Sequence, residues 1–238
     1  MTRTPTKAAP VPVYQVRITL RGTKPPIWRR VAVPSDITLA ELHEIIQIVM
    51  GWYDCHLHQF VVKCPERKPS SMELRELWLK GMVGEMAEFM RGERVFVDLS
   101  NEDLDMEGED EREVTLQELC RKVKSKLLYE YDFGDGWEHT VEVQKIYPPE
   151  EGVRYPVCLA GKRACPPEDC GGAWGYRDML KALANPKHPS HEDQAEWIGG
   201  GFDPAALNLE GISESLRRWR RHPRVVPGRA KRPRKRRS

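Results

Sequence analysis

Two runs of alternating apolar and polar residues around a short glycine turn constrain the fold of this chain most strongly. The runs are KLLYEYDF at 126–133 and WEHTVEVQKI at 137–146, and Gly134-Asp135-Gly136 separates them. Alternation with a period of two is typical of a half-buried β-strand. An Asp-Gly pair between two such runs favours a tight type I′ turn, because the central residues of that turn need positive φ. The sequence therefore predicts an antiparallel β-hairpin.

The remaining patterns predict further strands and several short helices. Thr38 with Glu41 and Thr115 with Glu118 form capping boxes, which mark the starts of two helices. Strands are expected at 13–20, 27–33, 57–63 and 95–99, helices at 71–91, 176–183, 190–198 and 212–221, and loops at 101–113 and 147–175. This order predicts an α+β fold, with a mostly antiparallel sheet and helices packed on one face.

Charge is unevenly distributed along the chain. Residues 217–238 hold 12 Lys or Arg and no acid. Removing these 12 from the 38 basic residues leaves 26 against 36 acidic residues, so residues 1–216 carry a net charge of −10. A dense run of like charges resists compaction. We therefore expect a flexible arm at 1–12, a single α+β domain at 13–216 and a disordered basic tail at 217–238.

The basic tail has two interpretations. Arginine and lysine neutralise phosphates and release counterions, so the tail could contact DNA or RNA. Alternatively, it keeps the protein soluble or folds back on the acidic body. The residues expected to contact nucleic acid are Arg217, Arg218, Arg220, Arg221, Lys231, Arg232, Arg234, Lys235, Arg236 and Arg237.

The composition also excludes some classes of protein. No apolar run approaches the roughly 18 residues that a membrane-spanning helix needs. No hydrophobic block follows the first basic residues, so no secretory signal is expected. The six cysteines are therefore expected to be reduced thiols in a cytoplasmic protein.

Several ordered motifs resemble one protein family. They are KPPIWRRVAVP (24–34), TLAELHEIIQIVMGW (38–52) with HLHQF (56–60), YEYDFGDGWEHTVEV (129–143), CPPEDCGGAWGY (165–176) and WIGGGFDP (197–204). The set is similar to the plasmid pRiA ORF-3-like family, also described as insertion-element passenger proteins of TnpR type. The resemblance implies a bacterial source, a compact α+β domain and an association with plasmids or transposable elements. The TnpR label suggests a resolvase, but no motif here resembles the catalytic arrangement of a serine recombinase.

The predicted hairpin carries the first candidate site. Asp132, Asp135 and His139 lie near its turn, and a histidine with carboxylates can bind a divalent metal or move a proton. The alternative is structural. In that case Asp135 forms the turn, Trp137 packs in the core and His139 lies on the solvent face of the sheet.

Three clustered cysteines form the second candidate site. Thiolates at these positions could bind zinc together with one histidine, although their spacing is wider than the C-x₂-C of a zinc ribbon. The alternative is that the thiols are buried and inert. The cysteines are Cys158, Cys165 and Cys170, and the histidine would be His139, His56 or His58.

Two acids between the last two of these cysteines offer a third possibility. Glu168 and Asp169 could join the hairpin acids in an oxygen-rich Mg²⁺ or Mn²⁺ site. His56 and His58 could also share a metal, because alternate residues of a strand point to the same face. The alternative for these two histidines is a polar strand edge.

These observations leave three hypotheses about function. The first is an accessory protein of mobile elements that binds nucleic acid through its tail, and it is favoured by the resemblance and the charge distribution. The second is a metal-dependent enzyme, such as a hydrolase, built from Asp132, Asp135, His139, Glu168 and Asp169. The third is a structural zinc protein that uses His139, Cys158, Cys165 and Cys170.

Overall fold

An eight-stranded sheet with the strand order β5-β4-β3-β6-β7-β1-β2-β8 forms the centre of the fold. The computed structural model describes residues 9–63, 75, 78–79, 92–100, 106–219 and 221. The paired strands run antiparallel, except for β4 with β5. The strands are β1 (Val13–Leu20), β2 (Ile27–Pro34), β3 (His58–Lys63), β4 (Glu93–Val97), β5 (Glu109–Asp110), β6 (Lys126–Tyr131), β7 (Trp137–Tyr147) and β8 (Val157–Lys162).

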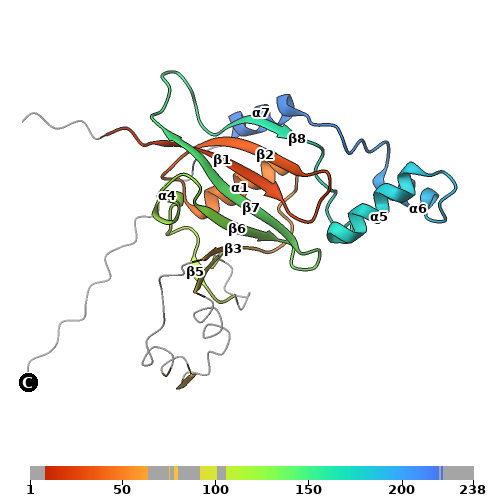
Figure 1. The fold of residues 1–238 in the computed structure, drawn as a ribbon, viewed down its shortest axis with the longest axis horizontal. Coiled ribbons are helices and arrows are strands. Elements are labelled where there is room, and N and C mark those ends of the chain that lie inside the picture. The colour runs from red at the N-terminus through yellow and green to blue at the C-terminus, as the bar shows by residue number, and fades with distance from the viewer. Residues whose placement is uncertain are drawn as a thin grey trace, which may run out of the picture.

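The described helices are α1 (Leu39–Met50), α4 (Leu116–Leu119), α5 (Gly172–Ala184), α6 (His191–Ile198) and α7 (Leu209–Arg218). Figure 1 shows α1 against one face of the sheet. α1 lies across the sheet, α7 contacts both α1 and β8, and α5 and α6 project beyond the strands. Within the described residues, no helix has the length and apolar character to cross a membrane. The predicted single-domain α+β fold is confirmed.

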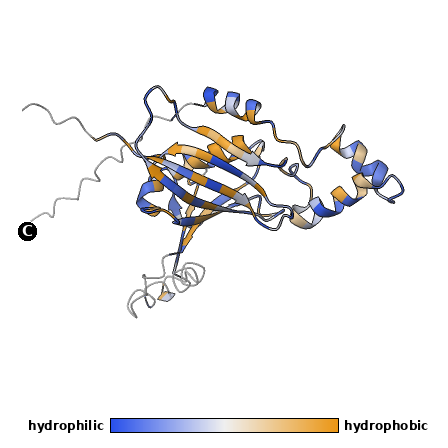
Figure 2. Cartoon of the chain, turned by 45° about the horizontal axis from the view of Figure 1, so that its top comes forward, coloured by the Kyte–Doolittle hydropathy of each residue, from blue (hydrophilic) through white to orange (hydrophobic). Residues whose placement is uncertain are grey.

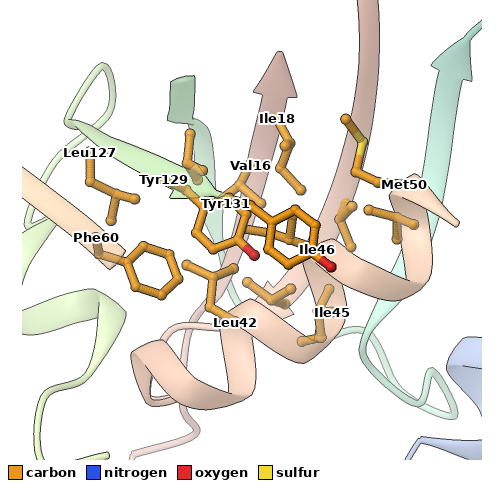
Figure 3. Packing of buried hydrophobic residues seen from close by; sticks show 14 of the residues in the cluster. Val16, Ile18, Leu42, Ile45, Ile46, Met50, Phe60, Leu127, Tyr129 and Tyr131 are labelled. Atoms are coloured by element: carbon orange, nitrogen blue, oxygen red, sulfur yellow. The ribbon is translucent and has the colours of Figure 1, made fainter. Parts of the chain in front are cut away.

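The hydrophobic core lies between α1 and the sheet. Leu42, Ile45 and Ile46 recur at helical spacing on α1 and lie against Val16 and Ile18 of β1 (Figure 3). All five side chains are fully buried. Burying a side chain of this size contributes about 1.5–3 kcal/mol. In Figure 2 the apolar colour concentrates on α1 and the strands, whereas α5 and α6 are more hydrophilic.

Local signals set the ends of α1 as the sequence predicts. Thr38 Oγ1 accepts a hydrogen bond from the Glu41 N–H at 3.1 Å, and the Glu41 carboxylate accepts one from the Thr38 N–H at 2.9 Å. Gly51 ends the helix at a φ of 89°, with its N–H on the Gln47 carbonyl at 2.8 Å. The second predicted capping box, at the start of α4, is also present. The left-handed Gly51 turns the chain sharply into residues 52–57.

The turn between β6 and β7 differs from the predicted type I′ turn. Positive φ occurs at Asp132 (55°) and Gly136 (65°), not at Asp135. The Gly136 N–H bonds the Asp132 carbonyl at 2.6 Å, so the turn spans residues 132–136. The cause is the Asp132 side chain, whose Oδ1 accepts from the N–H groups of Gly134 (2.9 Å) and Asp135 (3.2 Å). A side chain that satisfies two backbone donors favours this longer turn over the two-residue one.

Several other element bounds also differ from the prediction. β8 and β5 lie in stretches expected to be loops. β8 is defined by pairing with the distant β2, and β5 is only two residues long, so neither has a periodicity of its own. α5 begins at Gly172 rather than Tyr176, and α7 begins and ends earlier than expected. The helix expected at 71–91 and residue Cys64 lie outside the described residues, apart from positions 75 and 78–79.

Candidate metal centre

The segment after α1 is held in a fixed conformation by two side chains of that helix. Nε2 of His43 lies 2.8 Å from Oδ1 of Asp54, and Oε1 of Gln47 accepts from the Asp54 N–H at 3.2 Å. The hydrogen bond with His43 lowers the pKa of Asp54. Asp54 has a φ of 56°, a left-handed conformation that few non-glycine residues adopt. These contacts present Cys55 and His56, the next two residues, at the end of the sheet.

The end of β6 supplies a buried carboxylate to the same place. The Asp132 N–H bonds the Leu57 carbonyl at 2.9 Å, which ties the β6–β7 turn to the segment after α1. While Oδ1 of Asp132 holds the turn, Oδ2 lies 3.6 Å from Nε2 of His56. Only 9% of the Asp132 side chain is exposed.

The loop before α5 closes over both segments. Nε1 of Trp52 donates to the Pro166 carbonyl at 2.9 Å, and the Gly171 N–H donates to Oδ2 of Asp135 at 3.1 Å. Asp169 adopts a φ of 58° and places Oδ1 at 3.1 Å from Nε2 of His56. The hairpin acids and the cysteine-containing loop, far apart in the sequence, therefore meet.

Glu168 is fixed in the same region by two hydrogen bonds. It accepts one from the Tyr131 hydroxyl, and its Oε2 accepts one from the Tyr53 N–H at 3.2 Å. The Tyr131 hydroxyl in turn accepts from the Cys55 N–H at 3.1 Å. Burial and the bond to Glu168 raise the pKa of Tyr131, so the phenol stays protonated and remains a donor.

His56 is common to two groups of possible metal ligands. One group is His56, Asp132 and Asp169, and the other is Cys55, His56 and Glu168, and within each the ligand atoms lie within 4.8 Å of one another. Nε2 of His56 is shielded from solvent and, among the described residues, makes no hydrogen bond. One imidazole and two carboxylates suit Zn²⁺, Mn²⁺ or Mg²⁺, and an added thiolate favours zinc.

A neighbouring group of His43, Asp54 and His58 has similar spacing but an unsuitable geometry. The two imidazoles are stacked, with centroids 3.5 Å apart and planes 6° apart. The nitrogen lone pairs lie in the ring planes, so one ion cannot lie in line with both. His43 Nδ1 lies 2.8 Å from the Tyr129 hydroxyl, which also accepts from Gln47 at 2.8 Å. This group is therefore a hydrogen-bond network that is buried except at Asp54, whose side chain is half exposed.

Four of the five predicted catalytic residues lie at this centre, and His139 does not. Asp132, Glu168 and Asp169 belong to the two ligand groups, and Asp135 anchors the loop backbone. His139 is fully buried on the inner face of β7, with its ring against Trp52 and Tyr129. Burial lowers its pKa to about 3, so the ring is neutral.

The three predicted zinc cysteines do not gather with each other. Within the described part of the chain, none of Cys158, Cys165 and Cys170 belongs to a group of three ligand atoms within 4.8 Å. Burial raises the pKa of each thiol, and that of Cys170 to about 12. All three are free cysteines, as are Cys55 and Cys120. This geometry favours neutral, unreactive thiols.

Sequence reasoning missed part of what the segment after α1 contributes. Asp54 and Cys55 were not considered as ligands, and His56 was considered beside the cysteines or in a pair with His58, but not with Asp132 and Asp169. One signal could have pointed to this segment. His43 and Gln47 lie one turn apart on α1 and are polar residues within its mostly apolar buried face, so partners for them nearby could have been expected.

The described start of the basic tail contacts the body of the protein. Arg221 lies 3.0 Å from Oδ1 of Asp36 and 3.1 Å from Oε1 of Glu41. Nε1 of Trp219 donates to Glu44 at 2.6 Å. Arg218 pairs with Glu214 on its own helix. Of the other predicted nucleic-acid contacts, Arg217 lies in α7, whereas Arg220, Lys231, Arg232, Arg234, Lys235, Arg236 and Arg237 lie outside the described residues.

The fold defines a class of single-domain α+β proteins built on one long, mostly antiparallel sheet. The model of the plasmid pRiA4b ORF-3-like protein family matches residues 12–211, and the chain belongs to this family. The chain is 32% identical over 211 residues to the uncharacterized protein y4hQ of Sinorhizobium fredii (strain NBRC 101917 / NGR234), covering 86% of this chain and 90% of that protein. The predicted family is confirmed, whereas the link to insertion elements and a TnpR label stays a prediction.

A solved structure shares this fold. It is the crystal structure of the protein of unknown function MM3350 from Methanosarcina mazei Go1, with a TM-score of 0.68 and 34% identity. The similarity covers 85% of this chain and 98% of that one.

Proposed function

We propose that this protein is a divalent-metal-dependent hydrolase whose metal is held by His56, Asp132 and Asp169. The observation that carries the proposal is the position of His56 Nε2, 3.1 Å from Asp169 and 3.6 Å from Asp132. These three ligands come from three separate segments, and both acids have left-handed backbones. Strained backbone conformations of this kind concentrate at functional sites.

The chemistry of such a centre follows from its donors. A divalent ion here would polarise a substrate oxygen and lower the pKa of a bound water toward about 7. Glu168 is held by Tyr131 and by the Tyr53 N–H, close to His56, and can accept the proton that this water loses. Cys55 belongs with His56 and Glu168 to the second group of possible ligands, and a thiolate there would favour zinc over magnesium because it is a soft ligand.

Partial desolvation and the nearby Glu168 raise the pKa of the Cys55 thiol. A raised pKa makes the thiol a poor nucleophile by itself, since the thiolate is the reactive form. A metal bound by the second group would deprotonate the thiol, so Cys55 suits a ligand better than an attacking group.

Titration calorimetry with Zn²⁺, Mn²⁺ and Mg²⁺ tests the metal centre on the full chain. His56→Gln and Asp169→Asn are expected to weaken binding by about 10–100-fold or more, because each removes a ligand. Asp178→Asn is the matched control, since this exposed carboxylate on α5 pairs with Lys181 away from the cluster. Equal affinity in all three variants would overturn the proposal.

Water activation is tested with chromogenic esters and phosphodiesters. The metal-loaded protein is expected to hydrolyse one of these classes, and Glu168→Gln is expected to lower the rate constant while metal affinity stays within a few fold. If metal binds and no class is hydrolysed above the rate of the His56→Gln variant, the protein binds metal without being a hydrolase.

A second candidate function is nucleic-acid association through the basic tail, and the charge distribution favours it. Arg221 is already engaged with Asp36 and Glu41, and eight of the 12 basic residues at 217–238 lie beyond it, at 222–238. Replacing six tail residues by Gln in the full chain should flatten the salt dependence of DNA and RNA binding, because fewer counterions are released. The six are Lys231, Arg232, Arg234, Lys235, Arg236 and Arg237.

A control variant with the same change in net charge distinguishes an effect of the tail from an effect of the protein's total charge. It replaces six exposed residues of the body by Gln, namely Lys63, Arg121, Lys122, Lys145, Lys162 and Lys187. If the two variants lose the same affinity, net charge alone attracts nucleic acid, and the tail has no special role.

A further inference from the structure

Three exposed aromatic residues lie on the segments that form the candidate metal centre. Tyr53 is 87% exposed, Trp174 71% and Phe133 47%. Each lies on a segment that supplies a ligand or its support: Tyr53 precedes Asp54 and Cys55, Phe133 follows Asp132, and Trp174 lies in the first turn of α5. Tyrosine and tryptophan are enriched where proteins contact partners, because each combines a large apolar ring with a polar group.

Backbone contacts hold these three segments against one another. The Tyr53 N–H bonds Glu168 at 3.2 Å, and the Gly171 N–H bonds Asp135 at 3.1 Å. At Gly172, φ is 65°, and a Cβ would lie 2.3 Å from the Asp135 carbonyl oxygen. The start of α5 therefore packs backbone to backbone on the β6–β7 turn, and Trp174 lies one turn or less from that contact.

The charges around the aromatic residues indicate what could bind there. The carboxylates of the centre repel an anion as long as no cation is bound. A divalent ion reverses this, because it attracts phosphate oxygens directly. The guanidinium carbon of Arg177 lies over one face of the Trp174 ring, 4.1 Å from the ring centroid, and adds a cation there.

Phosphates attracted by a metal, together with exposed aromatic faces, match the chemistry of a single-stranded nucleic acid. Unpaired bases stack on aromatic side chains without regard to sequence, and a duplex hides those faces. We propose that the substrate of the metal centre is single-stranded nucleic acid, with a phosphate on the metal and bases stacked on Tyr53 and Trp174. This inference rests on the proposed metal centre.

Fluorescence anisotropy of a labelled oligothymidylate tests the inference. The protein is the full chain with the six tail residues changed to Gln, so that the tail does not mask the centre. Binding is expected with Mn²⁺ and is expected to disappear with EDTA. Trp174→Ala and Tyr53→Ala are each expected to weaken binding by about 5–100-fold, the range for loss of one stacked base.

Trp197→Ala is the matched control, because Trp197 is a 48% exposed tryptophan on α6. It is expected to change affinity by less than about twofold. A duplex of the same length is expected to bind at least about tenfold more weakly than the single strand, since its bases are not free to stack.

The outcomes separate this inference from the metal centre on which it rests. If calorimetry shows metal binding but the oligonucleotide does not bind, single-stranded nucleic acid is not the substrate, while the proposed metal centre is unaffected. The same conclusion follows if Trp174→Ala and Trp197→Ala weaken oligonucleotide binding equally. If duplex and single strand bind with equal affinity, the proposed stacking of bases on Tyr53 and Trp174 is wrong. If no metal binds, both proposals fall together.

Discussion

Glu111 lies 2.9 Å from Nε2 of His58 and is only 2% exposed. A carboxyl group that deep in a protein needs a partner, because the loss of its hydration is otherwise uncompensated. The contact ties the segment after β5 to the first residue of β3. His58 is itself stacked on His43, so the network extends from Glu111 to α1 and Asp54.

His58→Phe is expected to leave Glu111 without this partner in the interior. The free energy of unfolding should fall by about 1–3 kcal/mol or more, which is the cost of an unsatisfied buried polar group. Urea unfolding measures the change. The double variant His58→Phe with Glu111→Leu should recover part of the loss, since no buried carboxyl remains. A double variant as unstable as the single one would show that the loss comes from packing.

The buried imidazole of His139 should make stability depend on pH. Its pKa falls from 6.5 to about 3 on folding, because burial disfavours the charged ring. The unfolded chain therefore binds a proton between pH 6.5 and about 3 that the folded chain does not, and stability decreases as the pH falls through this window. The slope attributable to this residue is about 1.4 kcal/mol per pH unit.

Unfolding measured at several pH values checks this expectation. His139→Leu removes the titrating ring at similar volume and should remove that part of the slope. A variant that keeps the full pH dependence would assign it to the carboxyl groups instead.

Local sequence signals were sufficient for the elements that local contacts define. The bounds of β1 match the predicted 13–20, and both capping boxes form as expected. The type I′ turn was wrong, because the prediction ignored the Asp132 side chain as a competing acceptor for the turn amides. β8 was missed because its pairing with β2 spans most of the chain.

The sequence was sufficient to predict the acidic residues of the candidate centre, but not its histidine. Asp132, Glu168 and Asp169 stood out as clustered acids, whereas His139 was chosen as their partner over His56. The alternation of β7 already argued against this choice, since His139 shares the face of Trp137 and Val141, which are buried. That His56 lies beside Asp169 depends on three loops meeting, and no periodicity encodes such a meeting.

Gly175 should be essential for the position of the loop that carries Asp169. It lies inside α5, where alanine normally stabilises a helix by about 1 kcal/mol relative to glycine. Here a Cβ would lie 2.0 Å from the Cys170 carbonyl oxygen, a backbone atom that cannot move alone. Gly175→Ala is therefore expected to lower the unfolding temperature and to weaken metal binding.

Gly201→Ala is the matched control for this substitution. A Cβ at Gly201 meets nothing within 4 Å, so neither stability nor metal affinity should fall. If both alanine variants bind metal like the unchanged chain, the loop before α5 does not position the ligands.

Arg221 should stabilise the folded protein although it lies in the basic tail. It contacts Asp36 and Glu41, whose side chains are 13% and 4% exposed. Since Glu41 also caps α1, the contact joins the tail to the start of that helix. Arg221→Gln is expected to lower the free energy of unfolding by about 1 kcal/mol, because the pair is only partly exposed.

Arg218→Gln provides the comparison, because Arg218 pairs with Glu214 one helical turn away and its side chain is 78% exposed. An exposed pair of this kind contributes about 0.3–0.5 kcal/mol, and salt should screen it readily. Urea unfolding at low and high salt measures both variants. Equal losses would mean that Arg221 does not dock the tail. A larger loss at Arg221 means that a chain ending at 216 lacks a stabilising contact, so tail deletions should begin after residue 221.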